Sequence, residues 1–199
     1  HGTVRIHVKL SGEEVVDADV DVGYLHRAFE KSCETHTYTQ AQVYTDRLNY
    51  VSAMINNTGY MMAVEKLFDV EVTERCQWIR VLMCEISRVA DHATCIGASA
   101  MELGAMTAFL YLMKLREWAW ELVEDVCGAR VTTNWAKVGG LWDDLPDGFL
   151  EKVTSFVEKS RGVVDEVDKL LTRNRIFVDR VTGVGVMSRE DTISYGMTG

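Results

Sequence analysis

Three long stretches of the chain carry apolar residues at intervals of three and four, which places them on one face of an α-helix. They run from Thr45 to Phe68, from Glu74 to Ala90 and from Glu102 to Val126. Gly128 follows the third stretch, where a helix C-cap is expected. A fourth helix is expected from Asp147 to Leu171, opened by Pro146, the single proline. A chain of 199 residues with this pattern can bury a core of its own.

Residues 1–22 follow a different period, in which apolar and polar residues alternate as they do in a β-strand. The apolar positions of the first strand are Val4, Ile6, Val8 and Leu10. Ser11 and Gly12 supply a turn, and Glu13 to Val22 return as a second strand. We therefore expect an α+β, predominantly α-helical fold: an N-terminal β ribbon over residues 1–22, then one helical body over residues 23–199. Both ends of the chain are expected to be cut.

Charge and cysteine usage narrow the classes of partner and cofactor. The chain has 30 acidic and 21 basic residues and a formal net charge of −9, which argues against a nucleic-acid partner. Its 5 cysteines form no close pair and are expected to be reduced. His92 and Cys95 could share a metal if both lie on a helix, but a third ligand is missing nearby, so no metal is predicted.

The segment from Ala93 to Met113 is long enough to span a bilayer, which takes about 20 apolar residues. It carries a carboxylate, Glu102, near its midpoint, where burial in lipid is costly. Its many Ala, Gly, Ser and Thr residues suit close packing between helices. We therefore expect a buried bundle helix here rather than a membrane span.

Thr45 to Tyr50 are expected to open a helix, with Thr45 or Asp46 as its N-cap. Arg47 and Tyr50 would then share one face, where a fixed cation and a phenol could bind a ligand with a carbonyl group. The plainer alternative is a solvated arginine beside a half-buried tyrosine. Two interpretations of Glu102 are likewise open: it is either a buried acid with a partner or a solvent-facing residue at a helix N-terminus. Spacing alone therefore supports a helical domain with a candidate polar pocket.

Several short strings occur in an order that carries more information than their spacing. Among them are Gly23-Tyr24-Leu25-His26-Arg27, Tyr44-Thr45-Asp46-Arg47-Leu48-Asn49-Tyr50, Leu103-Gly104-Ala105-Met106-Thr107 and Gly128-Ala129-Arg130. Together they resemble the N-terminal half of the quinone-site subunit of respiratory complex I, also called its 49-kDa subunit. The resemblance extends over essentially the whole chain, and it implies a fold related to the large subunit of nickel–iron hydrogenases.

The resemblance implies a role inside a multisubunit NADH:quinone oxidoreductase that couples quinone reduction to proton translocation. In that family, this subunit and a partner that carries the terminal iron–sulfur cluster enclose the quinone. The chain itself would bind no cofactor, since NADH and FMN lie elsewhere in the complex and quinone is the substrate. The complex would be peripheral to its membrane through neighbouring subunits, on the bacterial cytoplasmic face or the mitochondrial matrix side.

The family pattern also assigns roles to individual residues. Tyr50 would hydrogen-bond one quinone carbonyl and donate a proton, and His1 would serve the other side. Because a phenol is a weak acid, it would give up its proton only to a strongly basic, reduced quinone. Glu102 would partner His1, and Ser52 would line the quinone site at the start of the same helix.

Arg27 and Arg47 match arginines close to the partner's cluster, where a fixed positive charge favours the reduced form. The chain departs from the family in two places. Glu102 stands where an aspartate is usual and is one methylene longer. Thr132 and Thr133 stand where many members carry histidines, so a pH dependence of the cluster potential that relies on an imidazole is not expected here.

Two alternatives to quinone reduction stay open. A nickel–iron hydrogenase would need C-x-x-C thiolates after Arg47, but Asn49 and Ser52 occupy those positions, and an amide and a hydroxyl cannot replace two thiolates. A scaffold paralogue without quinone chemistry would have no need to keep His1, Tyr50 and an acid at position 102 together.

Overall fold

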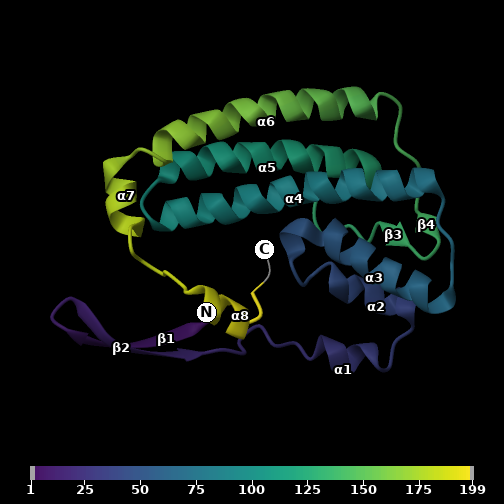
Figure 1. Ribbon diagram of the computed structural model, residues 1–199. Coiled ribbons are helices and arrows are strands. Elements are labelled where there is room, and N and C mark those ends of the chain that lie inside the picture. The colour runs from purple at the N-terminus through teal and green to yellow at the C-terminus, as the bar shows by residue number, and fades with distance from the viewer. Residues whose placement is uncertain (1–2, 198–199) are drawn as a thin grey trace. The chain divides into compact units, whose positions relative to one another are not determined.

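The chain divides into two compact units, residues 1–44 and 45–199. The computed structural model describes residues 3–197 of them (Figure 1). This boundary follows the contacts between residues, whereas the division predicted after Val22 follows the change of sequence period. Each unit has its own secondary structure and is described by itself.

The first unit opens with the predicted ribbon, in which β1 (Arg5–Ser11) pairs antiparallel with β2 (Glu14–Asp21). Gly12 supplies the turn with a positive φ of 66°, a conformation that favours glycine. The register shifts between Lys9 and Leu10, and both strands are exposed along their length. Two short helices follow, α1 (Phe29–Cys33) and α2 (Tyr38–Thr45). The predicted N-terminal ribbon is thus confirmed.

The second unit is a stack of long helices (Figure 1). Its elements are η1 (Tyr50–Ser52, a 3-10 turn), α3 (Ala53–Phe68), α4 (Glu74–Glu102), α5 (Met106–Cys127), β3 (Ala136–Lys137), β4 (Gly140–Leu141), α6 (Phe149–Leu171), α7 (Arg175–Val181) and α8 (Arg189–Ser194). Helix α4 packs against both α3 and α5, and α6 covers α5. The predominantly helical α+β class is confirmed, while the relation to the hydrogenase large subunit stays a prediction.

The helix boundaries differ from the predicted ones where local geometry overrides apolar spacing. The first long helix begins at Ala53 rather than Thr45, and the second continues past Ala90 to Glu102. Gly128 caps α5 as predicted, with a φ of 71° and its N–H donating to the Glu124 carbonyl at 2.8 Å. The last long helix begins at Phe149, just after the predicted start.

The segment from Ala93 to Met113 is divided between α4 and α5, so it is not the one continuous helix that was predicted. Gly104 makes the break with a φ of 89°. Arg180 donates to the Leu103 carbonyl, and a Cβ on Gly104 would lie 2.7 Å from Arg180 Nη1. Within residues 3–197, no helix is long and apolar enough to cross a membrane.

Helices α3 and α4 run antiparallel, as a series of contacts between them shows. Near the end of α3, Glu65 bonds to Arg80, close to the start of α4. One step along, Cys84 Sγ lies 3.5 Å from Thr58 Oγ1. The turn that leads into α3 therefore lies beside the middle of α4.

Glu65 and Arg80 form a buried, two-pronged ion pair. Arg80 Nη1 lies 2.8 Å from Glu65 Oε2, and Nη2 lies 2.6 Å from Oε1. Arg80 Nη2 also donates to the carbonyls of Lys137 and Gly140 at 2.9 Å, and the Gly139 N–H donates to Glu65 at 2.8 Å. Burial opposes ionisation of Glu65, but these hydrogen bonds outweigh it and lower the pKa of the carboxyl. The pair thus joins α3, α4 and the β3–β4 hairpin.

Glu65→Gln leaves Arg80 buried without a countercharge. We expect it to lower the free energy of unfolding by about 3–5 kcal/mol, the usual result of removing one partner of a buried ion pair. Urea unfolding followed by circular dichroism measures the change. Arg88→Gln, which breaks the exposed pair with Glu85, is the control and should cost about 0–1 kcal/mol. Equal losses in the two variants would contradict the central role of the buried pair.

Candidate functional site

Tyr50 is displayed on a short turn between two helices. Helix α2 ends at Thr45, a turn covers residues 46–48, and Tyr50 opens η1 directly before α3. Tyr50 is 58% exposed, whereas Val51 and Ser52 beside it are buried. The turn therefore anchors itself through its second and third residues and presents a phenol at the surface of the second unit.

Hydrogen bonds hold the residues on either side of Tyr50. Asn49 Nδ2 donates to Ser52 Oγ at 2.7 Å and to Asp91 Oδ2 at 2.9 Å, and the Ser52 N–H donates to the Asn49 carbonyl at 3.1 Å. Asn56 Nδ2 donates to the same carbonyl at 3.3 Å. Spacing pointed to Tyr50 and the family resemblance to Ser52, but the contribution of Asp91 comes from the fold.

Asp46 does not cap a helix, contrary to prediction, because α2 has already ended and α3 has not begun. Its side chain is fully buried, and Oδ2 accepts a hydrogen bond from the Asn134 N–H at 2.7 Å. Asp46 Oδ1 has no hydrogen-bond partner among the described residues. Burial raises the pKa of Asp46 to about 6, although the Asn134 bond and the charge of Arg47 act in the opposite direction. Apolar spacing carried no signal for this buried acid.

Arg47 is exposed and lies in the turn, so it does not share a helical face with Tyr50 as predicted. Its charge acts on the neighbouring Asp46. Arg27 is also exposed and belongs to the first unit. The assignment of both arginines to the surroundings of a partner's cluster stays a prediction.

The three remaining predicted residues lie in different surroundings. Ser52 is 3% exposed, and its hydroxyl accepts the bond from Asn49. Glu102 is the last residue of α4 and is exposed, so it is neither a buried acid nor a residue at a helix N-terminus. His1 lies outside the described residues. Their roles toward quinone stay predictions.

The loop after α5 lies against Asp46 and contains both threonines that stand in place of histidines. Thr132 and Asn134 have positive φ angles of 52° and 44°. Thr133 Oγ1 is buried without a hydrogen-bond partner in the described part of the chain. Arg130 fastens the start of this loop to α5 through Glu117 and Glu124. The loop is therefore held at one end by exposed ion pairs and at the other by Asp46.

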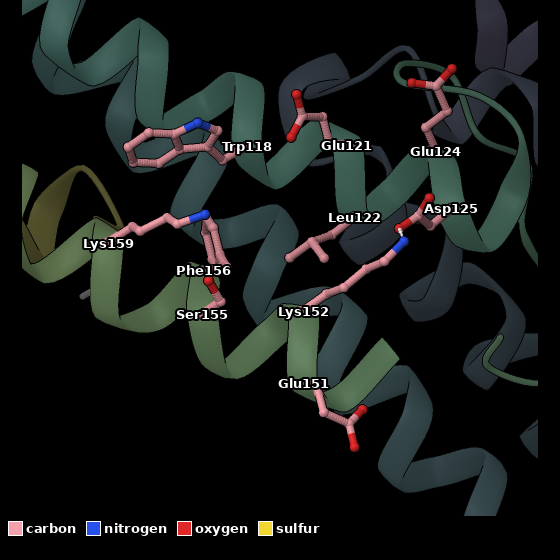
Figure 2. Close-up of a pocket in the computed structure, with 10 residues that line it drawn as sticks. All are labelled: Trp118, Glu121, Leu122, Glu124, Asp125, Glu151, Lys152, Ser155, Phe156 and Lys159. Carbon is pink, nitrogen blue, oxygen red and sulfur yellow. Dashed lines mark hydrogen bonds and ion pairs between the residues drawn. The ribbon is translucent and has the colours of Figure 1, made fainter. Parts of the chain in front are cut away.

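The structure also contains an open groove between α5 and α6, with a volume of about 620 Å³ (Figure 2). Lys152 Nζ donates to Asp125 Oδ2 at 2.7 Å across it, and Lys159 lies 6.0 Å from the ring centre of Trp118. None of the predicted site residues that the structure describes lines this groove. Four carboxylates and two lysines line it, and of these only Asp125 and Lys152 pair across it, so we assign it no chemistry.

His92 and Cys95 are both exposed on α4. Throughout residues 3–197, His, Cys, Asp and Glu side chains nowhere gather in a group of three that could hold a metal ion. Beside the exposed Tyr50, the Asn49 amide bonds to the Ser52 hydroxyl and to the Asp91 carboxylate, so these groups hold the turn. A phenol on a turn held in this way can donate a hydrogen bond and a proton to a polar ligand.

Comparison with known proteins gives consistent matches. Residues 102–199 match the family described as the 49 Kd subunit of the respiratory-chain NADH dehydrogenase. Over 199 residues the chain is 50% identical to a D-type NADH-quinone oxidoreductase subunit of Anaeromyxobacter sp. (strain Fw109-5), covering 46% of it. It is 50% identical to the D-type subunit of Myxococcus xanthus, covering 48%, and 44% identical to the C/D-type subunit of Bdellovibrio bacteriovorus, covering 36%. The chain thus spans about half or less of these relatives, and the resemblance drawn from the short strings is confirmed.

Asp46 makes stability depend on pH in an unusual direction. Because its pKa rises from 3.8 to about 6 on folding, the folded chain binds more protons than the unfolded chain between these values, and this contribution to stability falls as the pH rises. We expect a slope approaching 1.4 kcal/mol per pH unit, roughly the value of one proton. Urea unfolding between pH 4 and 7 should show that Asp46→Asn removes the slope.

The matched control is Asp143→Asn, which changes an exposed aspartate. If it flattens the profile as much as Asp46→Asn does, the proton is not held at Asp46.

Proposed function

Because residues 102–199 match the family of the 49-kDa subunit of the respiratory-chain NADH dehydrogenase, and the whole chain is 50% identical to a D-type subunit, we propose that the chain belongs to this family and forms one wall of the quinone-reduction site of that complex. The observation that carries the proposal is the placement of Tyr50. Tyr50 is 58% exposed on a turn whose neighbouring residues are buried or hydrogen-bonded. A fixed and accessible donor of this kind suits a quinone carbonyl.

Reduction of a quinone to a quinol takes two electrons and two protons. The electrons would come from NADH through the terminal iron–sulfur cluster of the partner subunit, since the chain itself supplies only side chains. Tyr50 would donate a hydrogen bond to one carbonyl oxygen and pass its proton once electrons have made that oxygen basic. His1 would serve the other carbonyl, with Glu102 as its partner. The phenolate left on Tyr50 would then regain a proton from its surroundings.

Positive charge supplied by two arginines would assist the same reaction. Arg47 is exposed three residues before Tyr50, and Arg27 is exposed in the first unit. Arginines facing the partner's cluster would favour its reduced form and keep the electron close to the quinone. Ser52 would contribute by holding the turn, since its hydroxyl is engaged with Asn49.

The complex as a whole would couple this reaction to proton translocation. The chain would be a peripheral subunit that reaches the membrane only through neighbouring subunits, on the bacterial cytoplasmic face or the mitochondrial matrix side. Quinone would be its substrate, and FMN would lie in another part of the complex.

A hydrogenase reaction fits the turn poorly. At the two positions where thiolates would bind nickel, Asn49 and Ser52 bond to each other at 2.7 Å. An amide N–H and a hydroxyl engaged in this way offer no soft ligand to nickel. A scaffold paralogue is the remaining alternative, and it differs from the proposal in its response to loss of the Tyr50 hydroxyl.

Tyr50→Phe removes one hydroxyl and leaves the turn intact. We expect inhibitor-sensitive NADH:quinone reductase activity of the intact complex to fall by about a hundredfold, the lower end of what a general acid contributes. NADH oxidation by an artificial acceptor, drawn upstream of the quinone, should stay unchanged and so report assembly.

Tyr111→Phe, at an exposed position on α5, is the matched control and should leave both rates unchanged. Unaltered quinone reduction in Tyr50→Phe would instead favour the scaffold paralogue.

A further inference from the structure

We propose that Asp91 on α4 is a positioning residue for Tyr50 and that it acts through Asn49. The proposal rests on the proposed function, in which Tyr50 serves the quinone. It adds a residue that is distant from Tyr50 in the sequence and whose contact with the turn exists only in the folded chain. The juxtaposition that carries it is the pair of hydrogen bonds made by the Asn49 amide.

The Asn49 amide bridges the turn and the helix. Its Nδ2 lies 2.7 Å from Ser52 Oγ and 2.9 Å from Asp91 Oδ2, so both of its N–H donors are in use. The orientation of the amide follows from its partners, since a carboxylate only accepts hydrogen bonds and Nδ2 must therefore face Asp91. One amide group thus ties the serine behind Tyr50 to the long helix beside it.

Tyr50 lies in the sequence between Asn49 and Ser52, the two turn residues that this hydrogen bond joins. Ser52 is buried, and its N–H donates back to the Asn49 carbonyl at 3.1 Å. η1 packs against α4, which is itself held between α3 and α5. The backbone on both sides of Tyr50 is therefore fixed relative to α4, the central helix of the three, and the exposed phenol inherits a defined position.

Asp91 is available for this role because its charged neighbour is engaged elsewhere. Arg88, three residues earlier on α4, donates from Nε to Glu85 at 3.1 Å. The Asp91 carboxylate on α4 accepts a hydrogen bond and the Asn49 amide on the turn donates one, so the two groups are complementary. An aspartate at position 49 would place two carboxylates face to face at the same distance.

This polarity gives a reciprocal test. Asn49→Asp replaces the donor by an acceptor and should push the turn away from α4. Asp91→Asn alone keeps an acceptor oxygen and should have a smaller effect. When both substitutions are combined, the Asn side chain at position 91 can donate to the Asp side chain at position 49, and the Ser52 hydroxyl can donate to the same carboxylate. The double variant restores the bridge with its direction reversed.

The experiment measures kcat and KM for quinone in the intact complex, with the artificial-acceptor rate as the measure of assembly. We expect Asn49→Asp to lower kcat/KM for quinone by about tenfold, with an unchanged artificial-acceptor rate. The double variant should return to within about twofold of the native value. Rescue of this kind would not follow if Asp91 served only the stability of α4.

Two results would overturn the proposal: native quinone kinetics in Asn49→Asp, or a double variant as slow as that single variant. Tyr50→Phe, measured in the same series, separates this failure from that of the proposed function. If Tyr50→Phe loses quinone reduction and Asn49→Asp does not, the site stands and the positioning role falls. If Asn49→Asp does not assemble, Asn49→Ala removes both bonds without adding a charge, and unchanged kinetics in that variant would likewise overturn the role.

Discussion

The buried ion pair between Glu65 and Arg80 sets the arrangement on which the rest of the second unit depends. The groups that it joins come from α3, α4 and the β3–β4 hairpin, so one guanidinium and one carboxylate fix three segments that are distant in the sequence. Because α3 and α4 are antiparallel, fixing the far end of α3 also fixes its beginning. The turn that carries Tyr50 therefore meets α4 at Asp91. There the hydrogen bond from Asn49 fixes the beginning of α3 to α4, as the ion pair fixes its end.

Two buried acids in this unit show how strongly the hydrogen-bond partner of a carboxyl group determines its pKa. Glu65 faces a guanidinium and stays charged, so its pKa is lowered in spite of burial. Asp46 receives one backbone N–H, and Arg47 acts on it only as a neighbouring charge, so burial prevails and its pKa rises to about 6. The first acid holds the helices together, while the second accepts a hydrogen bond from the loop of Thr133 and Asn134. Neither behaviour follows from the type of side chain alone.

Sequence periodicity predicted the ribbon, the long helices and the cap at Gly128 because each depends on residues close in the chain. It misplaced the start of α3, since Val51 and Met54 are buried as a helix would bury them, although Val51 lies in a 3-10 turn. Spacing and the short strings together identified Tyr50 as the residue to test. The partners of Asn49 and Asp46 could not be predicted, because Asp91 and Asn134 come near them only after α4 and the loop that follows α5 have packed.

The link between α4 and α5 has an evolutionary consequence. Gly104 is kept open both by its φ of 89° and by the Arg180 side chain, which occupies the space a Cβ would need and binds the last turn of α4. A larger residue at position 104 would strain the backbone and displace the arginine from the Leu103 carbonyl in the same step. Replacement of Gly104 therefore carries two costs, whereas Arg180 can vary without straining the glycine, although Arg180 and the Leu103 carbonyl that it binds are 77 residues apart in the sequence.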